Sequence, residues 1–186
     1  MSFNGQVILP AAKDAKDLES IVESSYENGV FLDTHVGQLK HLYQLARKHH
    51  KKMFLHADLI QGLKNDEYAT EYLCQDVRPH GIISTKTGVI LKAKQKGVVA
   101  IQRIFLLDSN ALKKSYALLE KTKPDFIEVL PGLMPRIIAE VCQQTGIPVL
   151  AGGLIRTVDD VEQALQAGAT AITTSNKDLW KHYSRQ

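Results

Sequence analysis

Short runs of apolar residues recur along the chain, separated by longer segments that mix apolar and polar positions. Most of these runs are apolar at consecutive positions, which is typical of strands buried on both faces of a parallel sheet. We predict eight strands, at Val7–Leu9, Val30–Leu32, Met53–His56, Gly81–Ser84, Val98–Ile101, Phe126–Leu130, Val149–Ala151 and Ala171–Thr173.

The segments between the strands have helical periodicity. The clearest apolar stripe recurs at positions i, i+3, i+4 and i+7, as one face of a helix requires, and consists of Leu39, Leu42, Tyr43 and Ala46. Thr157 and Asp160 have the spacing of a capping box, and Asp108 is placed to cap a helix before Leu112. We expect helices to end in a left-handed residue at Gly29, Gly97, Gly146 and Gly168.

Strict alternation of strand and helix predicts parallel strands joined by right-handed crossovers, and eight such units close most simply into a barrel. The fold class is therefore α/β, a compact (β/α)8 TIM-type barrel formed by one domain over residues 1–186. Such barrels usually have about 250 residues, so this one needs minimal loops or contains one weak unit. An open doubly wound sheet is the alternative, but its glycine-rich fingerprint after the first strand is missing.

Amino-acid composition further limits the class of protein to which this chain can belong. The chain is 44% apolar and 23% charged, which is ordinary for a globular domain. It shows no secretory leader and no uncharged apolar stretch long enough to span a membrane, so we expect a cytoplasmic protein. Cys74 and Cys142 lie in helical patterns and are expected to be inert thiols, with no metal and no cofactor. The net charge of +3 is compatible with an anionic partner.

Two segments after the seventh and eighth strands favour a phosphate site. Gly152 and Gly153 leave the barrel without Cβ atoms, so their amides can approach an anion. Ser175 and Asn176 precede a short predicted helix, Lys177–Tyr183, whose N-terminal N–H groups face the same place. Barrels often bind phosphate there. The alternative is that the glycines form only a tight turn and that Ser175 and Asn176 form only a helix cap.

Ionisable and amide side chains follow the other predicted strands, where a packed core would not select them. They are Asp33, His56, Asp58, Lys86, Gln102, Arg103 and Glu128. Lys86 and Arg103 could neutralise Asp58 and Glu128 in a purely internal network. The same groups could line a polar ligand pocket, or could serve Schiff-base or proton-transfer chemistry on a sugar phosphate. The residues alone leave this choice open.

Taken together, these segments resemble the glycerol uptake operon antiterminator regulatory proteins, which respond to glycerol 3-phosphate. The resemblance covers nearly the whole chain and is strongest from the third strand onward. It is carried by the stretches His56–Gly62, Gly81–Lys86, Gln102–Ser109, Lys123–Gly132, Ala151–Ile155 and Thr174–Trp180. The Ala-Gly-Gly turn alone is weak, whereas the full ordered set is specific.

The resemblance implies a cytoplasmic regulator and not a catalyst. Such a protein binds glycerol 3-phosphate and acts on the leader mRNA of a glycerol-metabolism operon, preventing termination and stabilising the transcript. On this interpretation Gly152, Gly153, Ser175 and Asn176 hold the phosphate, and the residues around the glycerol end are Asp58, Lys86, Arg103 and Glu128. These roles follow from strand-end geometry. The alternatives are a phosphosugar aldolase or isomerase in the same pocket, and a scaffold with a vestigial site.

No recognisable RNA-binding module is present in the sequence. Basic residues nevertheless gather at the predicted helix ends, on the barrel face opposite the ligand, and are candidates for RNA contact: Arg47, Lys48, Lys51, Lys52, Lys94 and Lys96. Cations at helix C-termini also complement the helix dipole without any partner. The tail Trp180–Arg185 is a rival contact, because aromatic rings stack on unpaired bases, although Trp180 could equally pack the last helix against the barrel. A homodimer would double the RNA contacts, but the sequence identifies no interface.

Overall fold

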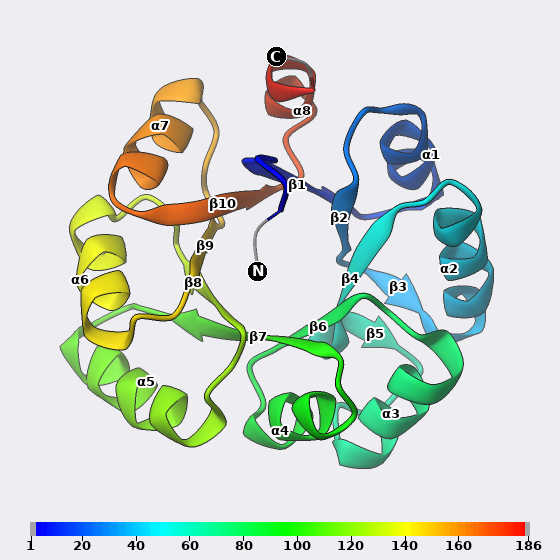
Figure 1. Cartoon of the computed structure of the whole chain (residues 1–186), viewed down its shortest axis with the longest axis horizontal. Helices are drawn as coiled ribbons and strands as arrows, with labels where there is room; N and C mark the ends of the chain where they lie inside the picture. The colour runs from blue at the N-terminus through cyan, green and yellow to red at the C-terminus, as the bar shows by residue number, and fades with distance from the viewer. Residues whose placement is uncertain (1–2, 185–186) are drawn as a thin grey trace.

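Parallel strands close into a barrel surrounded by helices in the computed structural model, which describes residues 3–184 (Figure 1). The order around the barrel is β1-β10-β9-β8-β7-β6-β4-β2, so every barrel strand has two partners. The barrel strands are β1 (Ile8–Ala12), β2 (Asn28–Phe31), β4 (Lys52–His56), β6 (Gly81–Ser84), β7 (Val99–Phe105), β8 (Phe126–Leu130), β9 (Val149–Gly152) and β10 (Ala169–Thr174). The (β/α)8 prediction is confirmed, and closure excludes the open doubly wound sheet.

The helices lie outside the barrel, each following a strand. They are α1 (Ala15–Glu23), α2 (Leu39–Lys48), α3 (Glu67–Tyr72), α4 (Thr87–Gln95), α5 (Ser109–Thr122), α6 (Pro135–Thr145), α7 (Val158–Gln166) and α8 (Lys177–Tyr183). The capping box predicted for α7 is confirmed, with Thr157 and Asp160 each bonding the other's backbone. Asp108 likewise caps α5, accepting from the N–H of Ala111 at 2.7 Å.

Three of the four glycines expected after helices have the left-handed backbone that this position favours. Gly97, Gly146 and Gly168 have φ angles of +71°, +63° and +103°. The prediction for Gly29 is wrong, because this residue lies inside β2 and ends no helix. A Cβ there would lie 3.0 Å from the side chain of Met53 and 3.2 Å from the carbonyl oxygen of Pro10, so glycine serves close strand packing.

The predicted strands all correspond to barrel strands, with differences at their ends. β1 continues through Pro10 and two small alanines to Ala12, which brings Lys13 to its carboxyl end. A second, two-stranded sheet was not predicted: β3 (Thr34–His35) pairs with β5 (Ile60–Gln61). It joins the loops that follow β2 and β4, on the carboxyl side of the barrel.

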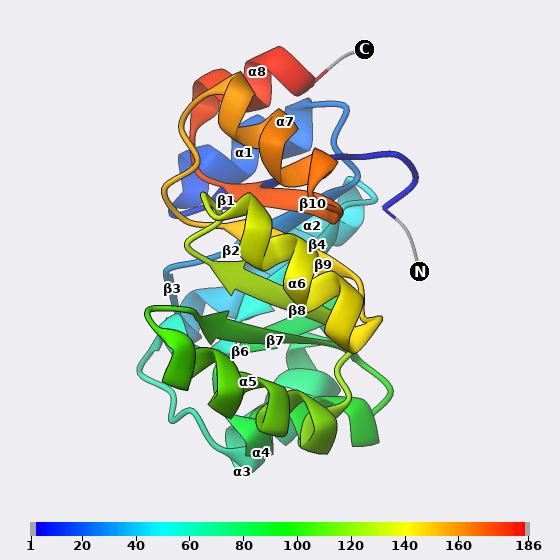
Figure 2. The ribbon, with the colours of Figure 1, turned by 90° about the vertical axis from the view of Figure 1, so that its left-hand side faces the viewer.

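Inward-facing side chains of the barrel form a core of their own, separate from the one beneath the helices. Its members are Phe3, Leu9, Ala11, Val30, Phe54, Ile83, Ile101, Phe126, Leu150 and Ala171. Phe3 packs against Phe54 and Phe126, with ring centroids 5.9 and 5.0 Å apart. The N-terminal segment thus covers the amino end of the barrel, on the side away from the strand arrowheads in Figure 2. The carboxyl ends are left to form the site.

Trp180 belongs to the core and not to an exposed tail. Its side chain is 6% exposed, and its indole N–H donates to the carbonyl oxygen of Thr174 at 2.7 Å. The phenol of Tyr26 donates in turn to the Trp180 carbonyl at 2.8 Å. The prediction that Trp180 could stack on RNA is therefore wrong, because its ring packs α8 against the barrel. Arg185, at the end of the same tail, lies outside the described residues.

The two cysteines form no disulfide, and both are half-buried. Burial raises the pKa of Cys74 to about 11, and burial also raises the pKa of Cys142, so both thiols stay protonated at neutral pH. Among the described residues, no helix has the length and apolar character needed to cross a membrane.

Replacing Trp180 by alanine should lower the free energy of unfolding by about 3–5 kcal/mol, because a large buried ring and its hydrogen bond are lost together. Urea unfolding followed by circular dichroism measures this. Leu107→Ala is the control, since that side chain is 82% exposed and its loss should change stability by less than about 0.5 kcal/mol. Equal effects of the two substitutions would contradict the role given to Trp180.

Candidate functional site

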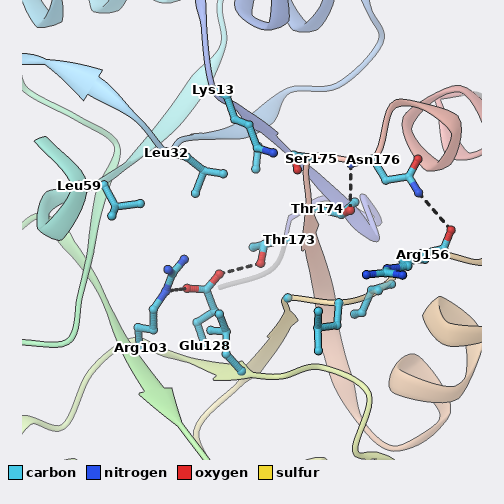
Figure 3. Close-up of a pocket in the computed structure, with 15 residues that line it drawn as sticks. Lys13, Leu32, Leu59, Arg103, Glu128, Arg156, Thr173, Thr174, Ser175 and Asn176 are labelled. Carbon is cyan, nitrogen blue, oxygen red and sulfur yellow. Dashed lines mark hydrogen bonds and ion pairs between the residues drawn. The ribbon is translucent and has the colours of Figure 1, made fainter.

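A cavity of about 590 Å³ opens at the carboxyl ends of the barrel strands (Figure 3). This volume lies within the range of roughly 300–1,000 Å³ that small-molecule sites occupy. The lining residues come from strand ends all around the barrel: Ala11, Lys13, Leu32, Leu59, Arg103, Glu128, Leu130, Gly153, Leu154, Ile155, Arg156, Thr173, Thr174, Ser175 and Asn176. Three are cationic and one is a carboxylate, so the cavity suits an anionic ligand.

Glu128 forms the polar floor of this cavity. Its side chain is 1% exposed, and one carboxylate oxygen accepts from Nε of Arg103 at 2.7 Å. The other oxygen accepts from the hydroxyl of Thr173 at 2.6 Å. The register of β7 and β8 places Arg103 directly opposite Glu128. Arg103 uses only Nε for this pair, so its terminal nitrogens are left facing the cavity (Figure 3).

Gly152 lies against this floor and not in the cavity lining. A Cβ at this position would lie 2.4 Å from the hydroxyl oxygen of Thr173 and 3.2 Å from the carboxylate of Glu128. Glycine is therefore required for the Thr173–Glu128 bond to form. The N–H of Gly132 donates to the carbonyl of Gly152 at 2.6 Å, which braces the turn from the neighbouring loop.

The turn after β9 and the segment after β10 present backbone donors to the cavity. Gly153 and Leu154 have φ angles of +74° and +63°, and the second value is strained for a residue with a side chain. Within residues 3–184, the N–H groups of Gly153, Leu154 and Ser175 donate to no other protein group. Strain of this kind concentrates at functional sites. The predicted pair Gly153 and Ser175 is thus brought together beside one cavity.

Lys13 and Arg156 also line this side of the cavity, and sequence reasoning missed both. The backbone N–H of Lys13 donates to Asp17 at 3.0 Å, while its side chain extends toward Ser175 (Figure 3). Arg156 is held by its own N–H, which donates to Asp160 at 2.9 Å. Neither side chain has an ion-pair partner among the described residues. Lys13 would have been identified if the first strand had been predicted to end later in the sequence. Arg156 would have been identified if the predicted phosphate-binding segment had included one more residue after Gly-Gly-Leu-Ile.

Asn176 is a helix cap in this structure. Its side-chain oxygen accepts from the N–H groups of Asp178 at 2.9 Å and Leu179 at 3.4 Å. Its side-chain nitrogen donates to the carbonyl of Arg156 at 3.1 Å. Asn176 thus joins α8 to the loop after β9, and it also lines the cavity.

Asp58 and Lys86 lie outside the lining of the cavity. Asp58 accepts hydrogen bonds from the side chain of Asn65 and the N–H of Thr85, both at 2.7 Å, and from the hydroxyl of Ser84. Burial by itself would raise the pKa of Asp58, but these hydrogen bonds outweigh it and hold that pKa below its ordinary value. Asp58 therefore anchors the loop after β4. Lys86 is exposed and does not pair with Asp58, contrary to the internal network considered above.

The candidate RNA-contacting cations lie at helix ends on the opposite face, and most have structural partners. Arg47 donates to the carbonyl of Val77 at 2.9 Å, and Lys51 donates to the carbonyls of Ser24 and Tyr26, both at 2.8 Å. Lys94 pairs with Asp125 at 3.6 Å, and Lys96 pairs with Glu71. For Lys48 and Lys52, both exposed, the described residues provide no side-chain partner.

Comparison with known proteins gives a consistent result over almost the whole chain. Residues 8–180 match the family described as "Glycerol-3-phosphate responsive antiterminator". The crystal structure of a glycerol uptake operon antiterminator regulatory protein from Listeria monocytogenes is 50% identical, with a TM-score of 0.95 and coverage of 97% of this chain and 98% of that one. A glycerol uptake operon antiterminator-related protein from Thermotoga maritima is 28% identical, with a TM-score of 0.84 and coverage of 95% and 98%. The uncharacterized protein YgcP of Escherichia coli K12 is 30% identical over 93% of this chain and 91% of its own length.

Replacing Asp58 by asparagine should lower the free energy of unfolding at neutral pH by about 1–3 kcal/mol, because a half-buried acceptor of three hydrogen bonds loses its charge. The folded-state pKa of Asp58 is lowered. Its contribution is therefore present above about pH 4 and is lost as the pH falls through the folded-state pKa. When the free energy of unfolding is measured with urea between pH 7 and pH 2, it should fall less with decreasing pH in the variant than in wild type. Asp33→Asn, at an exposed carboxylate, is the control.

Proposed function

We propose, because this chain belongs to the glycerol-3-phosphate responsive antiterminator family, that it binds glycerol 3-phosphate in the cavity at the carboxyl ends of its strands and acts on the leader mRNA of a glycerol-metabolism operon. The observation that carries the ligand part is the set of N–H groups of Gly153, Leu154 and Ser175, which have no protein acceptor within residues 3–184. Lys13 and Arg156, which have no ion-pair partner in the same range, flank these groups. In this proposal the ligand changes the affinity for RNA, and the protein prevents termination in the cytoplasm.

The phosphate is assigned to the side of the cavity formed by Gly153 and Ser175. Backbone N–H groups and a hydroxyl can bond the phosphate oxygens there, and Lys13 and Arg156 supply charge. This revises the sequence prediction in two places. Gly152 supports the floor, and Asn176 supports the loop, while the two cations take their places in the site.

The glycerol end is assigned to the floor. Arg103 presents its terminal nitrogens, and Glu128 lies beside it as an acceptor for hydroxyl groups. Arg103 and Glu128 thus keep the ligand-binding roles that the sequence predicted for them, whereas the proposal gives Asp58 and Lys86 no such role.

A catalytic role in sugar-phosphate chemistry has less support. Schiff-base enzymes need a lysine whose amine is desolvated or lies beside another cation. Among the residues that line the cavity, the lysine is Lys13, and it is exposed. Arg103 and Glu128 already neutralise one another as a close pair. Binding without turnover of glycerol 3-phosphate is the result that the proposal requires.

The RNA surface is assigned to the amino face of the barrel, with Lys48 and Lys52 as its primary contacts. These two cations are exposed and have no side-chain partner in the part of the chain that the structure describes, whereas Arg47, Lys51, Lys94 and Lys96 have protein partners. A cation with no protein partner can pair with a phosphate at lower cost than one that must first break a contact.

Substituting Gly153 by valine should abolish the stabilisation of the fold by glycerol 3-phosphate. A β-branched side chain is strained at the φ of +74°, and its Cβ would lie 3.3 Å from the side chain of Leu130, so the turn that carries the N–H groups has to shift. Thermal unfolding with and without ligand measures this. Wild-type protein at about 100 times the dissociation constant should gain roughly 2.7 kcal/mol.

Gly97→Val is a matched control, since Gly97 has a similar φ of +71°, open space around its Cβ position and a place on the opposite face. It should lose similar intrinsic stability and keep the ligand response. A folded Gly153→Val variant that still responds to glycerol 3-phosphate would show that the phosphate binds elsewhere.

Reversing the charge at Lys48 and Lys52 together should weaken leader-RNA binding and make its dependence on salt shallower, because fewer counterions are released. Filter binding or fluorescence anisotropy across a salt series measures both effects. The control reverses Lys113 and Lys114, two exposed lysines of α5. If the wild type and the Lys48/Lys52 variant have the same RNA affinity and the same dependence on salt, the amino face is excluded as the RNA-binding surface.

A further inference from the structure

His56 is a buried histidine on the inner face of the barrel, next to the cavity floor. It ends β4, where Phe54 belongs to the interior core while Met53 and Leu55 belong to the core beneath the helices. Successive side chains of a strand alternate between its faces, so His56 points inward like Phe54. Its partner across the register of β4 and β6 is Ile83, another interior residue. His56 therefore lies one step above the interior core, at the level of the floor.

Neither ring nitrogen of His56 has a hydrogen-bond partner among the described residues, although the residue is only 1% exposed. Nearly all buried polar side-chain atoms in folded proteins are bonded to protein, water or a ligand. Leaving two such atoms unpaired costs free energy, and a histidine is hard to place there for packing alone. His56 does not itself line the cavity, but it lies close enough to Arg103 and Glu128 of the floor to feel both charges. An inward-facing imidazole with two free nitrogens behind this floor therefore indicates a contact with a ligand that reaches the floor.

The imidazole is neutral at physiological pH. Burial, helped by the positive charge of Arg103, lowers the pKa of His56 to about 4 against the opposing effects of Glu128 and Asp58. A neutral imidazole has one N–H donor and one acceptor nitrogen. A hydroxyl group has the same two capacities, whereas a carboxylate has only acceptors.

We propose that His56 is a specificity determinant of the effector site, which hydrogen-bonds a hydroxyl of the glycerol end and discriminates against ligands that carry a second anionic group there. The inference rests on the proposed function and deepens it. The buried Glu128 acts in the same direction, because it already neutralises Arg103 as a close pair. A ligand carboxylate brought to this floor would therefore meet a second carboxylate beside the guanidinium, and the neutral ring of His56 adds no positive charge to offset that repulsion.

The arrangement of the strands fits a ligand that spans the cavity. In the barrel order, β4 lies across from β9, the strand that leads into Gly153. A ligand whose phosphate occupies the side of β9 and β10 therefore extends its other end toward the floor formed by β7, β8 and β4. Glycerol 3-phosphate has hydroxyl groups along that end.

The test compares wild type with His56→Leu, which keeps a similar side-chain size and removes both nitrogens. Calorimetry measures affinity for glycerol 3-phosphate, inorganic phosphate and 3-phosphoglycerate, which has a carboxylate in place of the terminal hydroxymethyl group. Two deoxy analogues, propane-1,2-diol 1-phosphate and propane-1,3-diol 1-phosphate, each lack one hydroxyl. His49→Leu, at an exposed histidine, is the matched control.

We expect His56→Leu to lower the affinity for glycerol 3-phosphate about tenfold, because the ligand loses one hydrogen bond and its hydroxyl group is left without a partner. Its affinity for inorganic phosphate should not change. The variant should also lose the preference for glycerol 3-phosphate over one of the two deoxy analogues. The mutation removes the imidazole and the analogue lacks the hydroxyl, so both changes remove the same hydrogen bond. Wild type should bind 3-phosphoglycerate at least about tenfold more weakly than glycerol 3-phosphate.

A folded His56→Leu variant that binds glycerol 3-phosphate as wild type does, or that loses inorganic phosphate equally, overturns the assignment of His56 and leaves the proposed function standing. Wild type that binds no glycerol 3-phosphate overturns both. If His56→Leu does not fold, proton–nitrogen correlation spectra of wild type decide the matter. The His56 nitrogens should shift with glycerol 3-phosphate and not with inorganic phosphate, and identical spectra in both titrations overturn the inference.

Discussion

The buried carboxylate of Glu128 is the contact on which the site depends. It is held on one side by Arg103 and on the other by Thr173, so it links β7, β8 and β10 across the barrel top. A buried charge with one partner removed costs several kcal/mol, which fixes the register of these strands and requires glycine at position 152. The turn after β9 begins at that glycine. The position of the anion-binding side is thus set by the same contact that neutralises the floor.

The barrel could be predicted from the sequence because its strands are short, continuous apolar runs and its helices carry clear caps. Features made by long-range contact could not. Phe3 has no local signal for its place beneath the barrel, and β3 and β5 are two residues long, too short for any periodicity. Their pairing depends on two loops meeting in space, which a single sequence does not record.

The candidate site was predicted in part, and the errors at Asp58 and Lys13 have one cause. Position relative to a strand end identifies a residue near the site, but the inward or outward direction depends on where the regular strand stops. His56 is inward, and alternation would place Asp58 inward too. The helical turn at Ala57–Leu59 breaks that alternation and rotates Asp58 toward Ser84. Lys13 was missed for the same reason, because β1 is longer than its apolar run suggested.

The two faces assigned to ligand and RNA are separated by the barrel interior, and this limits how one can affect the other. A ligand shifts an equilibrium only by binding two states with different affinity. The cavity floor rests directly on the interior core, since His56 follows Phe54 along β4 and Glu128 follows Phe126 along β8. Both phenylalanines contact Phe3 at the amino end. Close-packed interiors transmit displacement with little loss. A rearrangement of the floor would therefore act on the strands that carry Phe54 and Phe126, and the packed rings of these residues and Phe3 extend from there to the amino end of the barrel.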